Sequence, residues 1–106
     1  MIRSTVRMTL PAKRLREALG VLCPLAERIR VEHGCVGCRV YKDAQERNVL
    51  MFEEVWQSEA DVDRHLRSPQ YRDLLLVMEM AVAAPEVRFD TVARSTGFET
   101  IEAART

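Results

Sequence analysis

Apolar residues in this chain of 106 residues switch repeatedly between the two-residue spacing of a strand and the spacing of a helix. The order of these spacings constrains the fold more than any other feature. The predicted elements are a strand, a helix, two strands, a helix in two parts and a strand, at residues 2–10, 11–34, 35–43, 49–56, 58–84 and 86–92.

Residues that typically begin or end helices stand at these boundaries. They are Pro11 in a first turn, Gly34 as a stop, Ser58 with Asp61 as a capping pair, Ser68 with Pro69 as a second start, and Pro85 as a stop. Pro24 lies inside the first predicted helix. Because proline removes a backbone donor and clashes with the preceding turn, we expect it to kink or divide that helix.

This order is the split β-α-β arrangement of ferredoxin-like folds, an α+β class in which helices cover one face of an antiparallel sheet. Residues 49–52 are apolar on both faces, so the second face is expected to meet another sheet. We therefore predict a homodimer in which two sheets pack face to face. Alternation stops after Val92, which indicates a single domain, 1–106, with a core at about 3–94 and a C-terminal tail, 95–106.

Charge and hydropathy argue against two classes of partner. Sixteen basic residues balance sixteen acidic ones, so no net field attracts nucleic acid or anionic lipid. No apolar run approaches the roughly 20 residues that cross a bilayer. The first ten residues lack the apolar region and the cleavage site of a signal peptide, so we expect a cytoplasmic protein.

Three cysteines in a chain with no export signal argue against a disulfide framework. Cys35 and Cys38 form a CxxC motif, but the motif opens a strand, in which positions three apart are expected to point to opposite faces. A zinc site needs about four ligands, and His33 beside this pair is too few. We interpret Cys38 as a small core residue and expect no redox or metal function.

A longer pattern runs from the glycine-led strand GCVGCRVYKD through NVLMFEEVWQSEADVDRHLRSPQYRDLL. Its distinguishing positions are Glu54, Trp56, Ser58, Ala60, His65, Ser68 and Tyr71. The pattern resembles the antibiotic biosynthesis monooxygenase family of dimeric α/β barrels, over about residues 3–94. The resemblance implies a pocket between sheet and helices in each subunit. It also implies oxidation of small quinol or phenolic aromatic molecules by dioxygen, with no flavin, metal or other cofactor.

A second branch of the same barrels binds and degrades haem. It uses an axial histidine where this chain has Leu75, and an asparagine that is matched here by Val6. Because both groups are missing, the resemblance does not extend to haem degradation.

His65 and Tyr71 are the candidate catalytic residues. Histidine has an ordinary pKa near 6.5 and could take a phenolic proton, or His65 could be a helix residue bonded to Asp61 or to a backbone carbonyl. Tyr71 could donate a hydrogen bond to a developing oxyanion, or it could simply begin the apolar stripe of its helix.

Trp56, Glu54 and Arg39 are the candidate substrate-binding residues. Trp56, the only tryptophan, could stack on a flat substrate or fill the core. Glu54 shares its side of the strand with Trp56 and is expected to face inward, where Arg39 or Arg88 could pair with it.

The sequence thus predicts a cofactor-independent monooxygenase that acts on a small quinol or phenol. Two alternatives stay open: a non-catalytic module that senses or carries a small aromatic molecule, and a structural dimer whose pocket its own side chains fill. No feature of the sequence separates the three, because the same apolar walls serve each of them.

Overall fold

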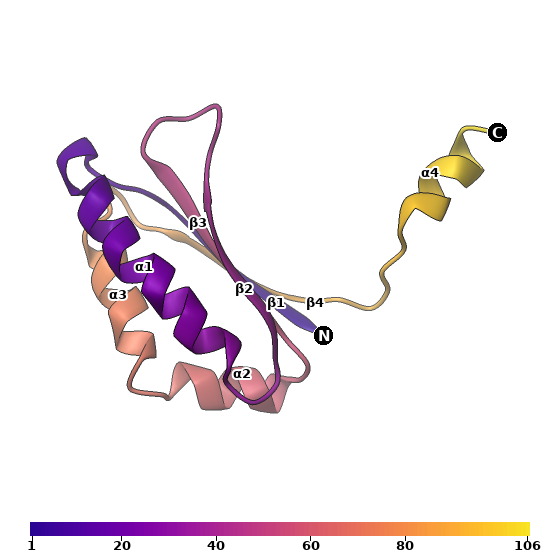
Figure 1. Ribbon diagram of the computed structural model, residues 1–106, viewed down its shortest axis with the longest axis horizontal. Helices are drawn as coiled ribbons and strands as arrows, with labels where there is room; N and C mark the ends of the chain where they lie inside the picture. The colour runs from indigo at the N-terminus through magenta and orange to yellow at the C-terminus, as the bar shows by residue number, and fades with distance from the viewer.

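The computed structural model describes all residues, 1–106, and contains one four-stranded antiparallel sheet in the order β2-β3-β1-β4. The strands are β1 (Ile2–Thr9), β2 (Cys35–Lys42), β3 (Val49–Trp56) and β4 (Glu86–Thr91). The helices are the short 3-10 turn η1 (Ala12–Arg14), then α1 (Leu15–Arg30), α2 (Glu59–Leu66), α3 (Tyr71–Glu79) and α4 (Phe98–Ala104). Helices α1, α2 and α3 cover one face of the sheet, which confirms the ferredoxin-like α+β class (Figure 1). No helix combines the length and the apolar character that a membrane span needs.

The core lies between the sheet and these helices. Alternation places Ile2, Val6 and Met8 of β1 toward the helices, together with Phe52 and Trp56 of β3. From the helix layer, the largest fully buried side chains are Leu22, Leu25, Ile29 and Leu74. Buried apolar area of this kind is the main source of stability in a domain of this size.

The first helix differs from the prediction at both ends. It begins at Leu15, because η1 occupies the residues after Pro11, and it ends at Arg30. It also continues through Pro24 without dividing, with the proline on its exposed side. Gly34 lies in the turn before β2 at φ 82°, a left-handed conformation that favours glycine. A Cβ atom there would collide with the Asp61 carboxylate, so glycine also lets α2 approach this turn.

A β-bulge between Cys35 and Gly37 overturns the expected geometry of the CxxC motif. Cys35 lies opposite Trp56 and Cys38 lies opposite Glu54, so both cysteines face the helices, and Val36 is exposed. The prediction of opposite faces was therefore wrong. Burial above all raises the pKa of both the Cys35 and the Cys38 thiols, which keeps them protonated and weakly nucleophilic.

The predicted cap at Ser58 is confirmed. Its Oγ accepts a hydrogen bond from the backbone N–H of Asp61 (3.3 Å) and donates to Asp61 Oδ2 (2.8 Å). The second predicted cap was wrong: α3 begins after Gln70, and Ser68 Oγ instead donates to the carbonyl oxygen of His65 (2.7 Å). On α3 the buried residues are Tyr71, Leu74 and Val77, whereas Leu75 is exposed.

Replacing Ser58 by alanine is expected to lower the free energy of unfolding by about 1 kcal/mol, because α2 loses the acceptor at its N-terminus. Urea denaturation measures this change. Ser58→Thr, which keeps a hydroxyl acceptor, is the matched control. A full loss in the threonine variant, or none in the alanine variant, would contradict the capping role.

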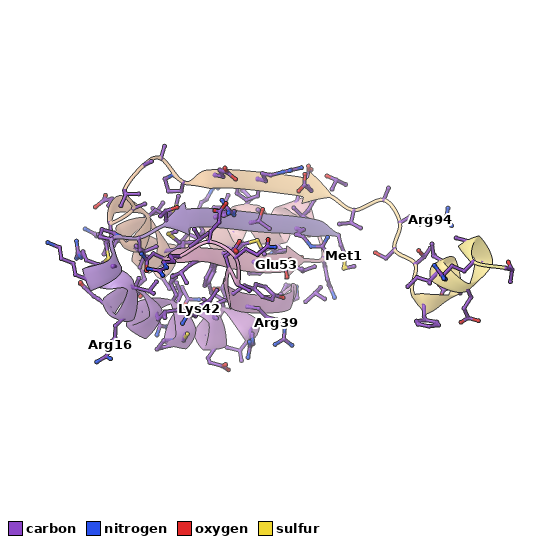
Figure 2. The ribbon with its side chains drawn as sticks, turned by 90° about the horizontal axis from the view of Figure 1, so that it is seen from above. Met1, Arg16, Arg39, Lys42, Glu53 and Arg94 are labelled. Carbon is purple, nitrogen blue, oxygen red and sulfur yellow. The ribbon has the colours of Figure 1, made fainter.

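The tail stands apart from this body. After β4 the chain leads away from the sheet to α4, which packs against neither the sheet nor the other helices (Figures 1 and 2). Two apolar side chains of α4, Phe98 and Ile101, are 70% and 52% exposed.

Candidate functional site

The most unusual buried group is a histidine held between two carboxylates. His65, on the inner side of α2, is 1% exposed. Its Nδ1 lies 2.9 Å from Glu32 Oε1, and its Nε2 lies 2.9 Å from Glu54 Oε2. A neutral imidazole donates at one of these nitrogens, and an imidazolium donates at both.

The two carboxylates differ in their access to solvent. Glu54, on β3, is 1% exposed and also accepts a hydrogen bond from Trp56 Nε1 (3.2 Å). Glu32, in the turn after α1, has a side chain that is 21% exposed, and it accepts a hydrogen bond from the Gln70 amide. The chain of contacts from Glu54 through His65 to Glu32 therefore runs from the interior to the surface.

Arginine does not take part in this arrangement. Arg39 is exposed and lies on the strand next to Glu53 (Figure 2), which it faces in the register of the sheet. It is therefore on the face of the sheet away from Glu54, and Arg88 pairs with Asp90 (3.2 Å). The expected pairing of Glu54 with Arg39 or Arg88 was wrong, because its partner comes from the helix layer above. Arg39 is accordingly separate from the other four candidate residues.

Two aromatic rings pack against His65. The Trp56 and His65 ring centroids are 4.6 Å apart at a tilt of 32°, and the Tyr71 ring meets His65 edge-on at 5.2 Å. The structure thus brings together Trp56, Glu54, His65 and Tyr71, four of the five residues that were singled out from the sequence.

The environment changes the acidity of two of these groups. Burial on its own would lower the pKa of His65, but the hydrogen bonds and charges of Glu54 and then Glu32 outweigh it, so this pKa lies above the ordinary 6.5. Burial, followed by the charge of Glu54, raises the pKa of Tyr71 to about 12. Tyr71 is therefore a neutral hydrogen-bond donor at physiological pH.

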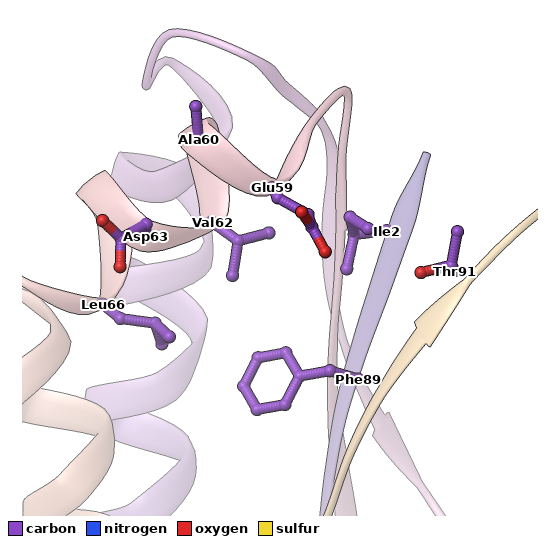
Figure 3. A pocket seen from close by; sticks show the side chains of 8 residues that line it. All are labelled: Ile2, Glu59, Ala60, Val62, Asp63, Leu66, Phe89 and Thr91. Atoms are coloured by element: carbon purple, nitrogen blue, oxygen red, sulfur yellow. The ribbon is translucent and has the colours of Figure 1, made fainter.

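A cavity of about 560 Å³ lies beside this cluster, between α2 and the edge of the sheet formed by β1 and β4. Figure 3 shows the Phe89 ring pointing from β4 toward Val62 and Leu66 of α2. The lining residues are Ile2, Glu59, Ala60, Val62, Asp63, Leu66, Phe89 and Thr91. This volume is within the range of roughly 300–1,000 Å³ that is usual for small-molecule sites.

None of the five candidate residues lines the cavity directly. His65 lies on α2 between Val62 and Leu66, which do line it, and its ring points into the layer behind them. The helices leave the inner side of β4 uncovered here, so Phe89 is 45% exposed. The cavity and the histidine cluster are therefore neighbours that share α2 and the sheet.

Ser4 lies between the cavity and the histidine cluster. It lies opposite Phe89 on one side and opposite Glu54 on the other, it is 2% exposed, and its hydroxyl forms no hydrogen bond within the chain. Every fully enclosed side-chain nitrogen or oxygen has a partner. The unbonded hydroxyls of Ser4 and Tyr71 must therefore reach space that is open to solvent.

Sequence reasoning missed Ser4, Glu32 and Gln70. Ser4 had a usable signal, because it is a polar residue at an inward position of the first strand. Glu32 and Gln70 had none, since they lie 33 and 38 residues from their partners and no local spacing relates them. The chain contains no cluster of three or more His, Cys, Asp or Glu side chains arranged to hold a metal ion.

The fold and the cavity together define a ferredoxin-like domain with space for a small molecule between its sheet and its helices. The model of one family, antibiotic biosynthesis monooxygenase, matches residues 1–75. The chain belongs to this family.

A curated relative, an uncharacterized protein of Synechocystis, is 30% identical over 70 residues, which are 65% of this chain and 48% of the relative. The chain thus spans about half the length of the curated relative that it matches.

Solved structures of low identity share the fold. A protein of Deinococcus radiodurans with the provisional name antibiotic biosynthesis monooxygenase has a TM-score of 0.83 at 17% identity, covering 92% of this chain and 98% of its own. A conserved protein of Methanosarcina mazei has a TM-score of 0.78 at 23% identity, with coverage of 84% and 89%. A protein of Mycobacterium tuberculosis has a TM-score of 0.78 at 22% identity, with coverage of 91% and 98%.

Proposed function

We propose that the protein binds a small quinol or phenolic aromatic molecule in the cavity and catalyses its oxygenation by dioxygen, without a cofactor. The observation that carries this proposal is a 560 Å³ cavity with mainly apolar walls, among them the Phe89 ring, next to a buried histidine between two carboxylates. Membership of the monooxygenase family supports the reaction type.

The chemistry suits such a site. An electron-rich phenolate can pass an electron to dioxygen by itself, so the protein has to bind the ring, remove a proton and hold the anion. For a phenol that carries an adjacent CH₂ group, the balanced change is CH₂ + O₂ → C=O + H₂O. One oxygen atom enters the product, the other leaves as water, and the substrate supplies all four electrons.

The residues divide these tasks. The side chains around Phe89 bind the ring of the substrate. Tyr71 does not line the cavity, so its neutral hydroxyl donates to the oxyanion of the substrate through a bridging water. Trp56 holds Glu54 and packs on His65, so it positions the buried cluster. Arg39 has no part in substrate binding, because it lies on the opposite face of the sheet.

Replacing Phe89 by alanine is expected to weaken the binding of a phenolic ligand about tenfold, because the cavity loses its only aromatic wall. The melting temperature of the Phe89→Ala variant should change little, because the Phe89 side chain is 45% exposed. Phe98→Ala removes an exposed ring from the separate helix α4 and is the matched control. Equal affinity in both variants, measured by calorimetry, would place the ligand elsewhere.

The homodimer is also part of the proposal. The face of the sheet that lies away from the helices carries charges of both signs, such as the Arg3–Glu53 pair (3.5 Å), around the half-buried Met51 and Val55. A surface of this kind can pair with its own copy across a two-fold axis.

Light scattering is expected to give twice the 12.2 kDa mass of one chain. Met51→Lys should give the single-chain mass, because it places an unpaired charge in the interface. Val31→Lys, at an exposed site beyond α1, should remain dimeric. A wild-type protein of single-chain mass would exclude the paired sheets.

A second function, non-catalytic binding of a small aromatic molecule, has one observation in its favour. Both ring nitrogens of His65 already face carboxylates, so no imidazole nitrogen is turned toward the cavity. Oxygen uptake and melting temperature, both measured with hydroquinones, naphthoquinols and anthrones, distinguish the two functions. Saturable oxygen uptake by metal-stripped protein, above a protein-free control, indicates the oxygenase. A raised melting temperature without such uptake indicates the binding module.

A further inference from the structure

We infer that Ser4 and Glu54 carry the proton of a cavity-bound phenol to His65, and that Glu32 holds the resulting imidazolium. The inference rests on the proposed function and deepens it, because it gives the buried cluster a role that His65 cannot have by direct contact with a ligand. It adds Ser4 to the site as a proton-transfer residue and Glu32 as a positioning residue.

Ser4 is the link on the cavity side. Its neighbour two residues earlier, Ile2, and its cross-strand neighbour Phe89 both line the cavity, and its other cross-strand neighbour is Glu54. Directly opposed residues have Cβ atoms about 5 Å apart, within reach of one bridging water. The Ser4 hydroxyl can donate to Glu54 and accept from a ligand at the same time, because a hydroxyl has one donor and two acceptor lone pairs.

The hydrogen-bonded path from Glu54 through His65 to Glu32 is continuous. Glu54 Oε2 and His65 Nε2 are 2.9 Å apart, and His65 Nδ1 and Glu32 Oε1 are also 2.9 Å apart. In neutral His65, Nδ1–H donates to Glu32, which leaves the Nε2 lone pair toward Glu54. Glu32 in turn accepts from the Gln70 amide, which keeps its carboxylate aimed at the ring.

One proton then moves and no electrons do. The phenolic O–H proton passes to Ser4 Oγ while the Ser4 hydroxyl proton passes to Glu54, and the Glu54 proton passes to Nε2. The ligand becomes a phenolate, and His65 becomes an imidazolium between two carboxylates. Since the overall reaction consumes no net proton, the same path returns the proton when the product forms.

The other titratable groups around His65 do not compete for this proton. Tyr71 of α3 and Cys35 and Cys38 of β2 surround the cluster, and burial above all raises the pKa of each of them. They therefore stay uncharged at neutral pH. The remaining charged neighbours of the imidazole are Glu54 and Glu32 themselves.

The test uses 2-naphthol, a phenol that keeps its proton in neutral water and whose anion absorbs at longer wavelength, on the full chain under nitrogen, so that no turnover occurs. The protein has two histidines, and the exposed His33 is an internal reference for ring NMR signals. The measurement is made at a pH where His65 is neutral in the protein without ligand. Binding is then expected to ionise the probe and to protonate His65. Ser4→Ala and Glu54→Gln should reduce ionisation of the bound probe about tenfold. Glu27→Gln, at an exposed site of α1 that does not line the cavity, should not.

Each result bears on one claim. A His65 signal that does not change when the probe binds, or full ionisation in both Ser4→Ala and Glu54→Gln, overturns the inference even if substrates take up oxygen. A probe that fails to bind the wild-type protein overturns it as well. Protonation of His65 by the probe, with no oxygen uptake by any phenol or quinol, upholds the inference and overturns the oxygenase.

Discussion

Replacing His65 by alanine is expected to lower the free energy of unfolding by about 3–5 kcal/mol, the usual cost of removing one partner from a buried charged group. The change leaves the Glu54 carboxylate, which is 1% exposed, with Trp56 as its only partner. Urea denaturation near pH 6 measures the effect. His33→Ala, at an exposed site, should stay within about 0.5 kcal/mol of the wild type. Equal stability of the two variants would show that the cluster does not hold the fold together.

The contribution of His65 to the free energy of unfolding is expected to decrease as the pH rises. The pKa of His65 in the folded protein lies above the 6.5 of an unfolded chain, so the folded state binds a proton more tightly. The stabilisation is fully present below pH 6.5 and is lost as the pH rises through the folded pKa. Wild-type stability should therefore fall across this window, and the fall should be absent in His65→Ala. A parallel fall in both proteins would assign it to another group.

The second large effect is expected on the rate of oxygen uptake when Glu54 is replaced. Glu54→Gln keeps the size of the side chain and an acceptor for the Trp56 indole but cannot carry the proton, so oxygen uptake should fall on the order of a hundredfold. Binding of the same substrate should change little, because Glu54 does not line the cavity. A matched exchange at the exposed Glu27, Glu27→Gln, should retain the full rate.

The rate and the stability should respond to pH in opposite directions. Neutral His65 accepts the proton, so oxygen uptake should rise as the pH increases through the raised pKa of His65, where stability falls. Uptake that is independent of pH in this window, or that Glu54→Gln leaves unchanged, would remove the buried cluster from the reaction.

Local patterns in the sequence predict local structure well. The order of spacings gives the four strands and the helices of the ferredoxin-like body, and the Ser58 cap follows from a pair of residues three apart. Alternation along β3 also places Glu54 inward beside Trp56. Each of these features depends on residues that are close in the chain, where periodicity and capping chemistry act.

Features that depend on distant residues were missed. The partner of Glu54 is His65, from a helix packed over the sheet, and the partner of His65 is Glu32, 33 residues away. The bulge at Cys35 depends on the pairing of β2 with β3, so alternation alone gave Cys35 the wrong face, whereas Cys38 lies in the core as predicted. The cavity likewise depends on the uncovered inner side of β4, which no single segment encodes.

The most direct test of the account is the mass of the product formed when metal-stripped protein acts on an anthrone under isotopically labelled dioxygen. One labelled oxygen atom is expected in the product, at a rate that depends on the protein and is lost in Glu54→Gln. Product without label, or labelled product at the rate of the protein-free control, would contradict the assignment of an oxygenase. Tight binding of the anthrone in that case would identify the cavity as a carrier or sensor site.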